Sequence, residues 1–408
     1  MNVLKKIKSF INTEEFLGYL ISLVLSTLFL GYAPSSIALG IFIMFSVRYL
    51  ILNKNNINFD FSLFLPVLMY FMFFLTLLWS VNQNLTKTGL ERTVAFLLVP
   101  AAFSFIPRIS LKNLEIILKC FTISNALLGF FFLILALINF SEIKSISVFV
   151  YHDLVSVLDL NAIYVSVAFS ISLFYLLSKN KKKWKHFILI IYFLILLFLL
   201  SSKTIFFILL FGLIVYPIFY KIKGISKGKL ILVTLLVLLF LGIGSISLKE
   251  RFLDESESKF SEVLSKEEFG KVYLWTGSSI RLLQLRILKD QIKEESIFWK
   301  GFGLFASRDN IKERHLKFNT YPEFHKYNYH NQYAQIFSET GIFGVILFFL
   351  ILLTSFIKAL KTNNFVAIMF NITMVIVFIT ESYLWRQHGL FLFISFYCVF
   401  NRLDIKNT

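Results

Sequence analysis

The residues of this sequence that are best suited to chemistry are isolated basic side chains, and the first is Arg281. It belongs to residues 278–295 (SSIRLLQLRILKDQIKEE), whose apolar spacing predicts an amphipathic helix with Leu285, Leu288 and Ile292 on one stripe. Arg281 falls one turn before Leu285 on that stripe. Near a helix start, free backbone N–H groups would help a guanidinium to bind phosphate. The alternative is that Arg281 snorkels to water or pairs with a carboxylate of the same loop.

The second candidate is His330, within residues 326–344 (KYNYHNQYAQIFSETGIFG). This segment predicts a short helix that begins after His330 and leads into an apolar run at Gly341. A neutral imidazole in that place could act as the general base on a sugar hydroxyl. A hydrogen-bonded structural histidine is the alternative.

The third candidate is Lys203, a single cation between two strongly apolar stretches in FLLSSKTIFFILL. A charge near membrane depth is costly enough to indicate a functional role. If the helix breaks at Ser201 and Ser202, however, Lys203 is an interfacial anchor.

Other positions carry weaker signals. Gly301 and Gly303 in WKGFGLF predict a tight turn, because no strand precedes them and no nucleotide-binding GxGxxG pattern is completed. Glu381, Arg386 and His388 flank the last outer turn, where they could form an ion pair or line a cavity. No cluster of histidine, cysteine and carboxylate residues has the spacing of a zinc site, and no DxD pair occurs in the outer loops. We therefore expect neither a metal ion nor another cofactor.

The elements that hold these residues follow from the composition. The chain has 408 residues, of which 57% are hydrophobic and 16% charged, and its mean hydropathy is +0.74. These values exclude a soluble globular protein and predict an all-α polytopic membrane protein. A span needs about 20 apolar residues, and runs of that size predict about twelve transmembrane helices. The expected spans are 16–33, 35–52, 61–80, 89–107, 114–138, 160–178, 186–202, 203–220, 229–248, 341–360, 363–381 and 384–402.

The charges of the expected loops predict the orientation. Lysine and arginine gather in the loops of one side, including the run 179–185. The opposite short loops hold only Lys87, Arg92, Lys144, Lys203 and Arg386. The positive-inside rule makes the richer side cytoplasmic and places both termini there. Much of the net charge of +17 is therefore topology, which argues against a nucleic-acid partner.

One segment departs from this alternation by its size. We expect residues 1–248 to hold transmembrane helices 1 to 9. Residues 249–340 would form one large outer, periplasmic loop that contains amphipathic helices, and residues 341–408 would hold helices 10 to 12 and a cytoplasmic tail. Binding and catalytic residues concentrate in loops that a rigid scaffold positions. The large loop, which carries Arg281 and His330, is therefore the expected functional segment.

Two short patterns in this loop resemble those of the O-antigen ligase family, whose superfamily includes O-antigen polymerases. The family pattern of a histidine, a small polar residue, a glycine and a later small residue is matched by His330, Asn331, Gly341 and Gly344. An Arg-x3-Leu pattern is matched by Arg281 and Leu285. Gly301 and Gly303 between the two patterns and the closing TESYLWRQHGLFLF are also similar.

The resemblance implies a glycosyltransferase of the bacterial inner membrane. Its donor would be a glycan linked through diphosphate to undecaprenol, and its acceptor would be a sugar hydroxyl of lipid A-core. Membrane lipid would be a further partner. His330 would be the base, and Arg281 with Lys203 would hold the departing diphosphate. Implied further substrate-binding residues are Asn331, Gly301, Gly303 and Arg386. Ligases tend to have an arginine where this chain has Lys203, and lysine lacks the planar fork that grips phosphate in two places.

Two other functions compete with the ligase. A polymerase that joins lipid-linked repeats would use the same base and the same cations. A lipid or glycan transporter is a different class, but it should show related halves and ionisable residues near mid-membrane. The expected spans are nearly free of charge, and the halves look unlike. A purely structural scaffold is the simplest alternative.

Overall fold

The computed structural model confirms the all-α class. It describes residues 10–53, 60–179, 183–219, 258–270 and 272–404, with only the backbone given for 217–219. Within these ranges every regular element is a helix, and the only bridge joins Ile109 to Leu403. Sequences rich in leucine, phenylalanine and isoleucine form helices here because a helix satisfies its own backbone hydrogen bonds in hydrocarbon.

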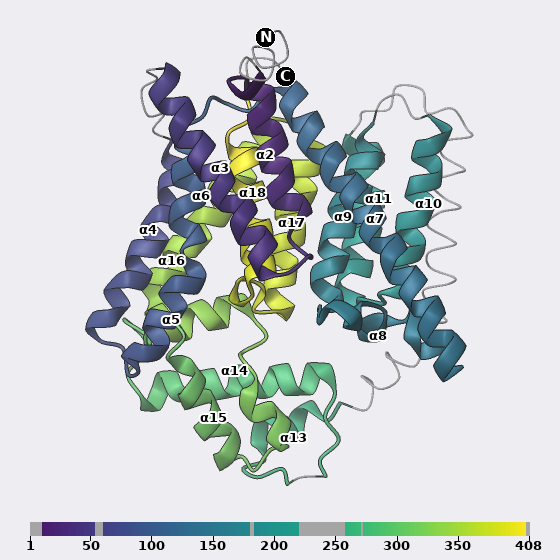
Figure 1. Ribbon diagram of the computed structural model, residues 1–408. Helices are drawn as coiled ribbons and strands as arrows, with labels where there is room; N and C mark the ends of the chain where they lie inside the picture. Colours follow the sequence, from purple (N-terminus) through teal and green to yellow (C-terminus); the bar gives the residue numbers. More distant parts are fainter. Residues whose placement is uncertain (1–9, 54–59, 180–182, 220–257, 271, 405–408) are drawn as a thin grey trace.

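The helices that carry the apolar runs stand side by side (Figure 1). They are α2 (Glu14–Ser26), α3 (Tyr32–Asn53), α4 (Phe61–Leu75) with η1 (Thr76–Leu78), α6 (Ala95–Ser104), α7 (Leu111–Ile143), α9 (Ala162–Ser178), α10 (Trp184–Leu199), α11 (Lys203–Phe219), α16 (Gln332–Lys361), α17 (Phe365–Thr380) and α18 (Gln387–Asn401). The polar helix α5 (Gln83–Thr93) precedes α6. Between α7 and α9 lie η2 (Ile146–Phe149), α8 (Tyr151–Val155) and η3 (Ser156–Leu158), and η5 (Tyr383–Trp385) precedes α18. Large apolar side chains of these helices form one continuous core.

The helix lengths confirm only part of the expected membrane topology. Four described helices are long and apolar enough to cross a membrane: Tyr32–Asn53, Phe61–Leu78, Leu111–Ile143 and Gln332–Lys361. A fifth arises if Tyr151–Leu158 and Ala162–Ser178, bent by 94°, form one span. The count of twelve is therefore not confirmed. The expected span 229–248 lies outside the described residues, and the expected span 89–107 is divided between the polar α5 and the ten-residue α6.

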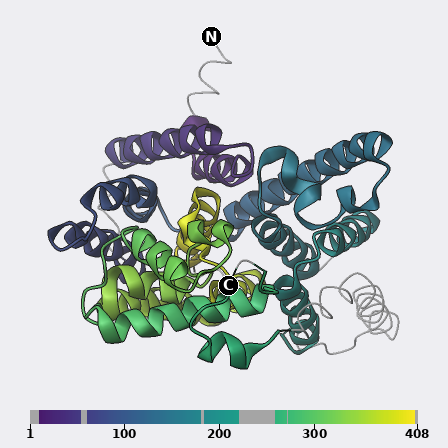
Figure 2. The ribbon, with the colours of Figure 1, turned by 90° about the horizontal axis from the view of Figure 1, so that it is seen from below.

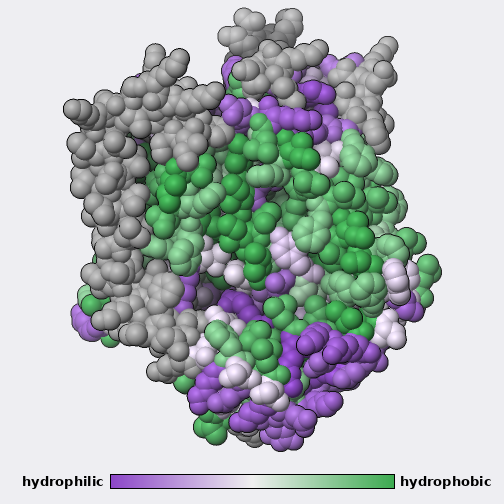
Figure 3. Space-filling model, turned by 180° about the vertical axis from the view of Figure 1, so that it is seen from behind, coloured by the Kyte–Doolittle hydropathy of each residue, from purple (hydrophilic) through white to green (hydrophobic). Residues whose placement is uncertain are grey.

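The surface has the layering of a membrane protein. Seen from behind, a hydrophobic belt covers the helices, and hydrophilic residues lie above and below it (Figure 3). Polar contacts between helix ends mark one face of the helix assembly. On one face, Lys112 at the start of α7 pairs with Glu15 at the start of α2, with Nζ and Oε2 2.8 Å apart. On the same face, the backbone N–H of Ile109 donates to the carbonyl of Arg402 at 2.7 Å, so the described chain begins and ends there.

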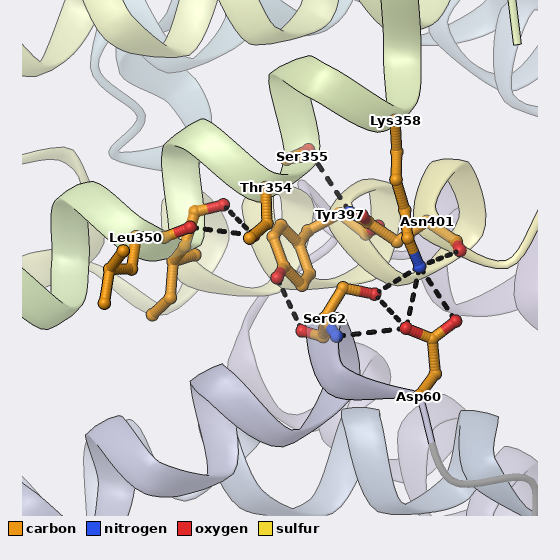
Figure 4. Close-up of polar contacts among 9 residues, drawn as sticks. Asp60, Ser62, Leu350, Thr354, Ser355, Lys358, Tyr397 and Asn401 are labelled. Atoms are coloured by element: carbon orange, nitrogen blue, oxygen red, sulfur yellow. Dashed lines mark hydrogen bonds and ion pairs between the residues drawn. The ribbon is translucent and has the colours of Figure 1, made fainter. Parts of the chain in front are cut away.

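The same face also has a polar cluster that ties three helices together (Figure 4). The Lys358 ammonium near the end of α16 lies 2.7 Å from Asp60 Oδ1 and donates to Ser62 Oγ at 2.8 Å, at the start of α4. It also donates to the carbonyl of Asn401, the last residue of α18, at 3.1 Å. The Tyr397 hydroxyl donates to the Ser62 carbonyl at 2.5 Å. An ion pair with this many additional hydrogen bonds fixes α4, α16 and α18 relative to one another.

A layer of short helices covers the opposite face, and we call residues 258–331 the loop layer. Its helices are α13 (Phe260–Ser265), α14 (Gly277–Glu294), α15 (Ser307–Lys317) and η4 (Pro322–Lys326). Seen from below, these green helices lie across the ends of the apolar helices (Figure 2). Two small apolar clusters hold the layer together, one around Leu283 and Ile287 and the other around Phe302 and Tyr329.

Helix α14 confirms the amphipathic helix expected over 278–295 but corrects its buried stripe. Thr276 caps its start, where Oγ1 accepts the Ser279 N–H at 3.2 Å. Leu285, expected to face inward with Arg281, is 42% exposed, whereas Leu283 and Ile287 are fully buried. The buried stripe runs through Ile280, Leu283 and Ile287, at i, i+3 and i+7. Of the expected stripe, Leu288 is buried and Ile292 is partly buried.

Helix α16 contains the break expected at Gly341. The residues before it form the short helix expected after His330, and Gly341 has the non-helical dihedrals φ 67° and ψ −164°. The chain can bend there because glycine tolerates positive φ. The break also brings the backbone of residues 298–303 against the short helix. The Ile342 N–H donates to the Phe298 carbonyl at 2.9 Å, and the Phe302 N–H donates to the Ser338 carbonyl at 2.8 Å.

Candidate active site

A polar cavity of about 730 Å³ lies between the loop layer and the helix ends. Its walls come from α3, α5, the start of α9, α15, η4, the segment before α16, and the turn between α17 and α18. The lining residues are Tyr32, Arg92, Asn161, Arg308, Ile311, Lys326, Tyr327, Asn328, His330, Glu381, Trp385, Arg386 and Gln387. The cavity therefore joins segments from the first hundred residues, the start of α9, the loop layer and the turn before α18.

His330 enters this cavity from the segment just before α16, next to the N-cap residue Asn331. Its backbone is left-handed, with φ 46°, and its N–H donates to Asn328 Oδ1 at 2.8 Å. The ring lies edge-on to Tyr327, with ring centroids 5.0 Å apart. The backbone turn and the aromatic contact hold the imidazole at the cavity wall, with 25% of its side chain exposed.

The partner of His330 is Glu381, the C-cap residue of α17. The His330 Nδ1 lies 3.4 Å from Glu381 Oε2, and the glutamate side chain is only 7% exposed. Burial by itself would raise the pKa of Glu381. The hydrogen bond with His330 and the nearby charges of His330, Arg281 and Arg386 outweigh burial, so the pKa lies below the ordinary value and the carboxyl group is ionised near neutral pH.

This pair has the arrangement of a general base with an orienting acid. A carboxylate that accepts a hydrogen bond from Nδ1 fixes the tautomer and leaves Nε2 to accept a proton. The same carboxylate stabilises the imidazolium that forms when the proton arrives. The geometry therefore suits proton removal from a hydroxyl group in the cavity.

Arg281 on α14 and the start of α11, where Lys203 lies, both meet the end of α17 next to Glu381. The Arg281 Nε donates to the Thr380 carbonyl at 2.9 Å, and its Nη1 donates to the Gly277 carbonyl, also at 2.9 Å. Lys203 is the first residue of α11, and the hydroxyl of Thr204 beside it lies 3.3 Å from that of Thr380. Both cations thus come from segments that meet the residue preceding Glu381, although neither lines the cavity itself.

The break before Lys203 is the one that the interfacial-anchor alternative requires. Helix α10 ends at Leu199, and Ser201 has φ 44°, so α11 begins afresh at Lys203. The lysine therefore lies at a helix end facing the loop layer rather than within a continuous span.

Four further cations line the cavity: Arg92, Arg308, Lys326 and Arg386. In the described part of the chain, none of their side chains has a hydrogen-bond or ion-pair partner. The Arg92 guanidinium lies 5.7 Å from the Phe305 ring centroid, and that ring stacks on Trp385 with centroids 3.9 Å apart. The only carboxylate in the lining is Glu381. The cavity is therefore strongly cationic and suited to anionic ligands.

The sequence indicated Arg386 and Glu381 at the last outer turn, but it did not identify Arg92, Arg308 or Lys326 as site residues. One signal pointed to Arg92: it was among the few cations expected on the side opposite the positive loops. Lys203 and Arg386 share that property and also lie at or beside the site. Arg308 and Lys326 belong to a long loop of mixed charge, where charge alone does not single them out.

Three residues expected to bind substrate are engaged within the fold instead. Asn331 caps α16, since its Oδ1 accepts the Ala334 N–H at 2.9 Å, and its Nδ2 donates to the Ile379 carbonyl at 3.0 Å. Gly301 and Gly303 have positive φ, and a Cβ on either would lie within 3 Å of neighbouring atoms. These contacts favour a positioning role for all three residues. Among the described residues, no group of three or more histidine, cysteine or carboxylate residues could hold a metal ion.

Comparison with known proteins gives one match. The family model described as O-antigen ligase matches residues 187–349, a range that includes Lys203, Arg281 and His330. No curated protein matches the chain. Glu381 and Arg386 lie beyond the matched range, so the match says nothing of them. The match confirms the resemblance found in the sequence, and over residues 187–349 it supports the O-antigen ligase family.

Proposed function

We propose that the protein is an O-antigen ligase-type glycosyltransferase that transfers a glycan from undecaprenyl diphosphate to a sugar hydroxyl of lipid A-core. The observation that carries this proposal is the His330–Glu381 pair at the wall of a cationic cavity. A base is needed for the acceptor hydroxyl, and cations are needed for the departing diphosphate. The cavity supplies both within one space.

In the proposed reaction, the acceptor oxygen attacks the anomeric carbon of the donor while His330 Nε2 takes the hydroxyl proton. The bond between the anomeric carbon and the diphosphate oxygen breaks, and undecaprenyl diphosphate leaves with its electron pair. Attack opposite the leaving group inverts the anomeric centre. Glu381 holds the imidazole and stabilises its charge. Arg386 in the cavity wall, together with Arg281 and Lys203 from beside the cavity, stabilises the diphosphate.

The donor brings its own activation, so the reaction needs no nucleotide. Its sugar–diphosphate bond is already reactive, and fixed cations can stabilise the leaving group in place of a metal ion. We therefore propose metal-independent transfer.

The proposed location is the inner membrane of a bacterium, with the cavity facing the periplasm and both termini in the cytoplasm. The support is the distribution of basic residues, which favours the face of the Asp60–Lys358 cluster as the cytoplasmic one. A flipped, lipid-linked donor would then reach the cavity from the outer leaflet.

An in vitro transfer assay tests the proposal. Purified protein receives an undecaprenyl-diphosphate-linked glycan, with lipid A-core offered or withheld, and wild type is compared with His330→Ala. A ligase joins glycan to lipid A-core only when His330 is present. Longer lipid-linked chains made without lipid A-core would identify a polymerase instead. If no glycosidic bond forms with substrates shown to be competent, the glycosyltransferase proposal is wrong and the transporter alternative leads.

A further inference from the structure

Cations lie both in the cavity wall and beside it, and they fall into two sets. The first set surrounds Glu381 and consists of Arg281 and Arg386, whose charges lower the pKa of that carboxyl group. Lys203 starts α11, whose Thr204 hydroxyl lies 3.3 Å from that of Thr380, the residue before Glu381. The second set consists of Arg92, Arg308 and Lys326, which line the cavity from other elements.

The two sets come from different parts of the fold. Arg92 is in the last turn of α5, Arg308 is the second residue of α15, and Lys326 ends η4. Helices α5 and α11 lie on opposite sides of the helix assembly in both ribbon views (Figures 1 and 2). Arg92 contacts the Phe305 ring, which stacks on Trp385, whereas Arg281 donates to the Thr380 carbonyl.

The second set lacks an internal counter-charge. Within the described residues, none of the side chains of Arg92, Arg308 and Lys326 has a hydrogen-bond or ion-pair partner, and the one carboxylate of the cavity is already bound to His330. Like charges that converge on one space repel each other unless an anion joins them. Guanidinium and ammonium groups match the oxygens of phosphate and carboxylate.

From this arrangement we infer a second anion subsite: Arg92, Arg308 and Lys326 bind a phosphate or carboxylate group carried by the acceptor glycan. The inference rests on the proposed function, because that function assigns the diphosphate of the donor to the first set. Arg308 and Lys326 belong to the loop layer, which an acceptor entering from the aqueous side meets first. An anionic group bound there would orient the neighbouring sugar hydroxyl toward His330.

Binding and transfer are measured separately on the full-length protein in detergent. The probes are phosphorylated lipid A-core and the same core after dephosphorylation, and a lipid-linked repeat containing a uronic acid and its carboxyl-reduced form. The variants are Arg308→Gln, Lys326→Gln and their combination. Lys317→Gln is the matched control, because it removes an exposed cation at the other end of α15, outside the cavity lining.

We expect the double variant to weaken binding of the anionic acceptor about tenfold or more and to leave binding of its neutralised form unchanged. The KM for the donor should not move, and the control should behave as wild type. The acceptor pair that shows the charge effect identifies the source of the anion. Equal effects on anionic and neutral acceptors, or none on either, would overturn the second subsite even if transfer occurs. Charge-dependent acceptor binding without any transfer would instead overturn the proposed function.

Discussion

Replacing Glu381 with glutamine removes the charge beside His330 while keeping the shape of the side chain. At 3.4 Å, a unit charge pair contributes about 5 kcal/mol for an effective dielectric constant of about 20. The neighbouring Arg281 and Arg386 offset part of the Glu381 charge, and His330 is partly open to water. We therefore expect the loss of transition-state stabilisation to be about 2 to 3 kcal/mol, which lowers kcat roughly 30- to 150-fold.

The assay is glycan transfer at saturating donor and acceptor, which isolates kcat. Glu381→Asp should retain more activity than Glu381→Gln, because it keeps the charge at a slightly greater distance. Glu323→Gln is the matched control, since Glu323 is exposed on η4 and lies outside the cavity lining. Thermal unfolding in detergent checks that each variant is folded. A folded Glu381→Gln protein with wild-type kcat would refute the role of the carboxylate in orienting and stabilising the imidazole.

Three other perturbations test separate parts of the structure. Arg281→Lys keeps the charge but loses the planar fork, so kcat/KM for the donor should fall about tenfold or more; wild-type turnover would remove Arg281 from the diphosphate site. Gly341→Ala places a Cβ 2.3 Å from a neighbouring backbone atom at φ 67°, and should cost about 2 to 4 kcal/mol in unfolding measurements. Gly270→Ala, at φ 75° in open space, controls for the dihedral strain alone, and equal losses in the two would argue against close packing. Burial lowers the pKa of His315 to about 4, so the unfolded chain takes up a proton there before the folded one does. Stability should therefore fall by about 2 kcal/mol between pH 7 and pH 5, and His315→Gln should flatten that slope; a slope unchanged by the substitution would contradict the assignment.

The helical class could be predicted because apolar runs of about 20 residues have few other structures available in a membrane. Where those runs break could not be predicted as well. The sequence predicts one span over residues 89–107, but the structure divides them at Val94. Leucine, alanine and valine are compatible with both a continuous and an interrupted helix, so the composition could not locate this break. The break at Gly341 could be predicted because a glycine there coincides with a change from polar to apolar sequence.

In the candidate site, some residues could be predicted from neighbouring sequence, but contacts between distant segments could not. Local spacing and family resemblance indicated Arg281 and His330. The pairing of His330 with Glu381 could not be predicted, because 51 residues separate them and helix α16 must turn before α17 brings the carboxylate back. Arg92 is still more distant, and only its position on the side poor in cations gave a hint of function.

The glycines of the family-like pattern act through the backbone rather than through substrate. The Gly303 N–H donates to the Glu339 carbonyl at 3.0 Å, and a Cβ on Gly301 would lie 2.4 Å from a backbone atom of that same residue. This close contact locks the short helix that follows His330 against the loop layer, while the break at Gly341 lets the rest of α16 enter the hydrophobic belt. His330 is thereby held at the boundary between belt and loop layer. If the donor is the lipid-linked glycan of the proposed function, the same backbone contacts that shape the fold would also set the distance between base and donor.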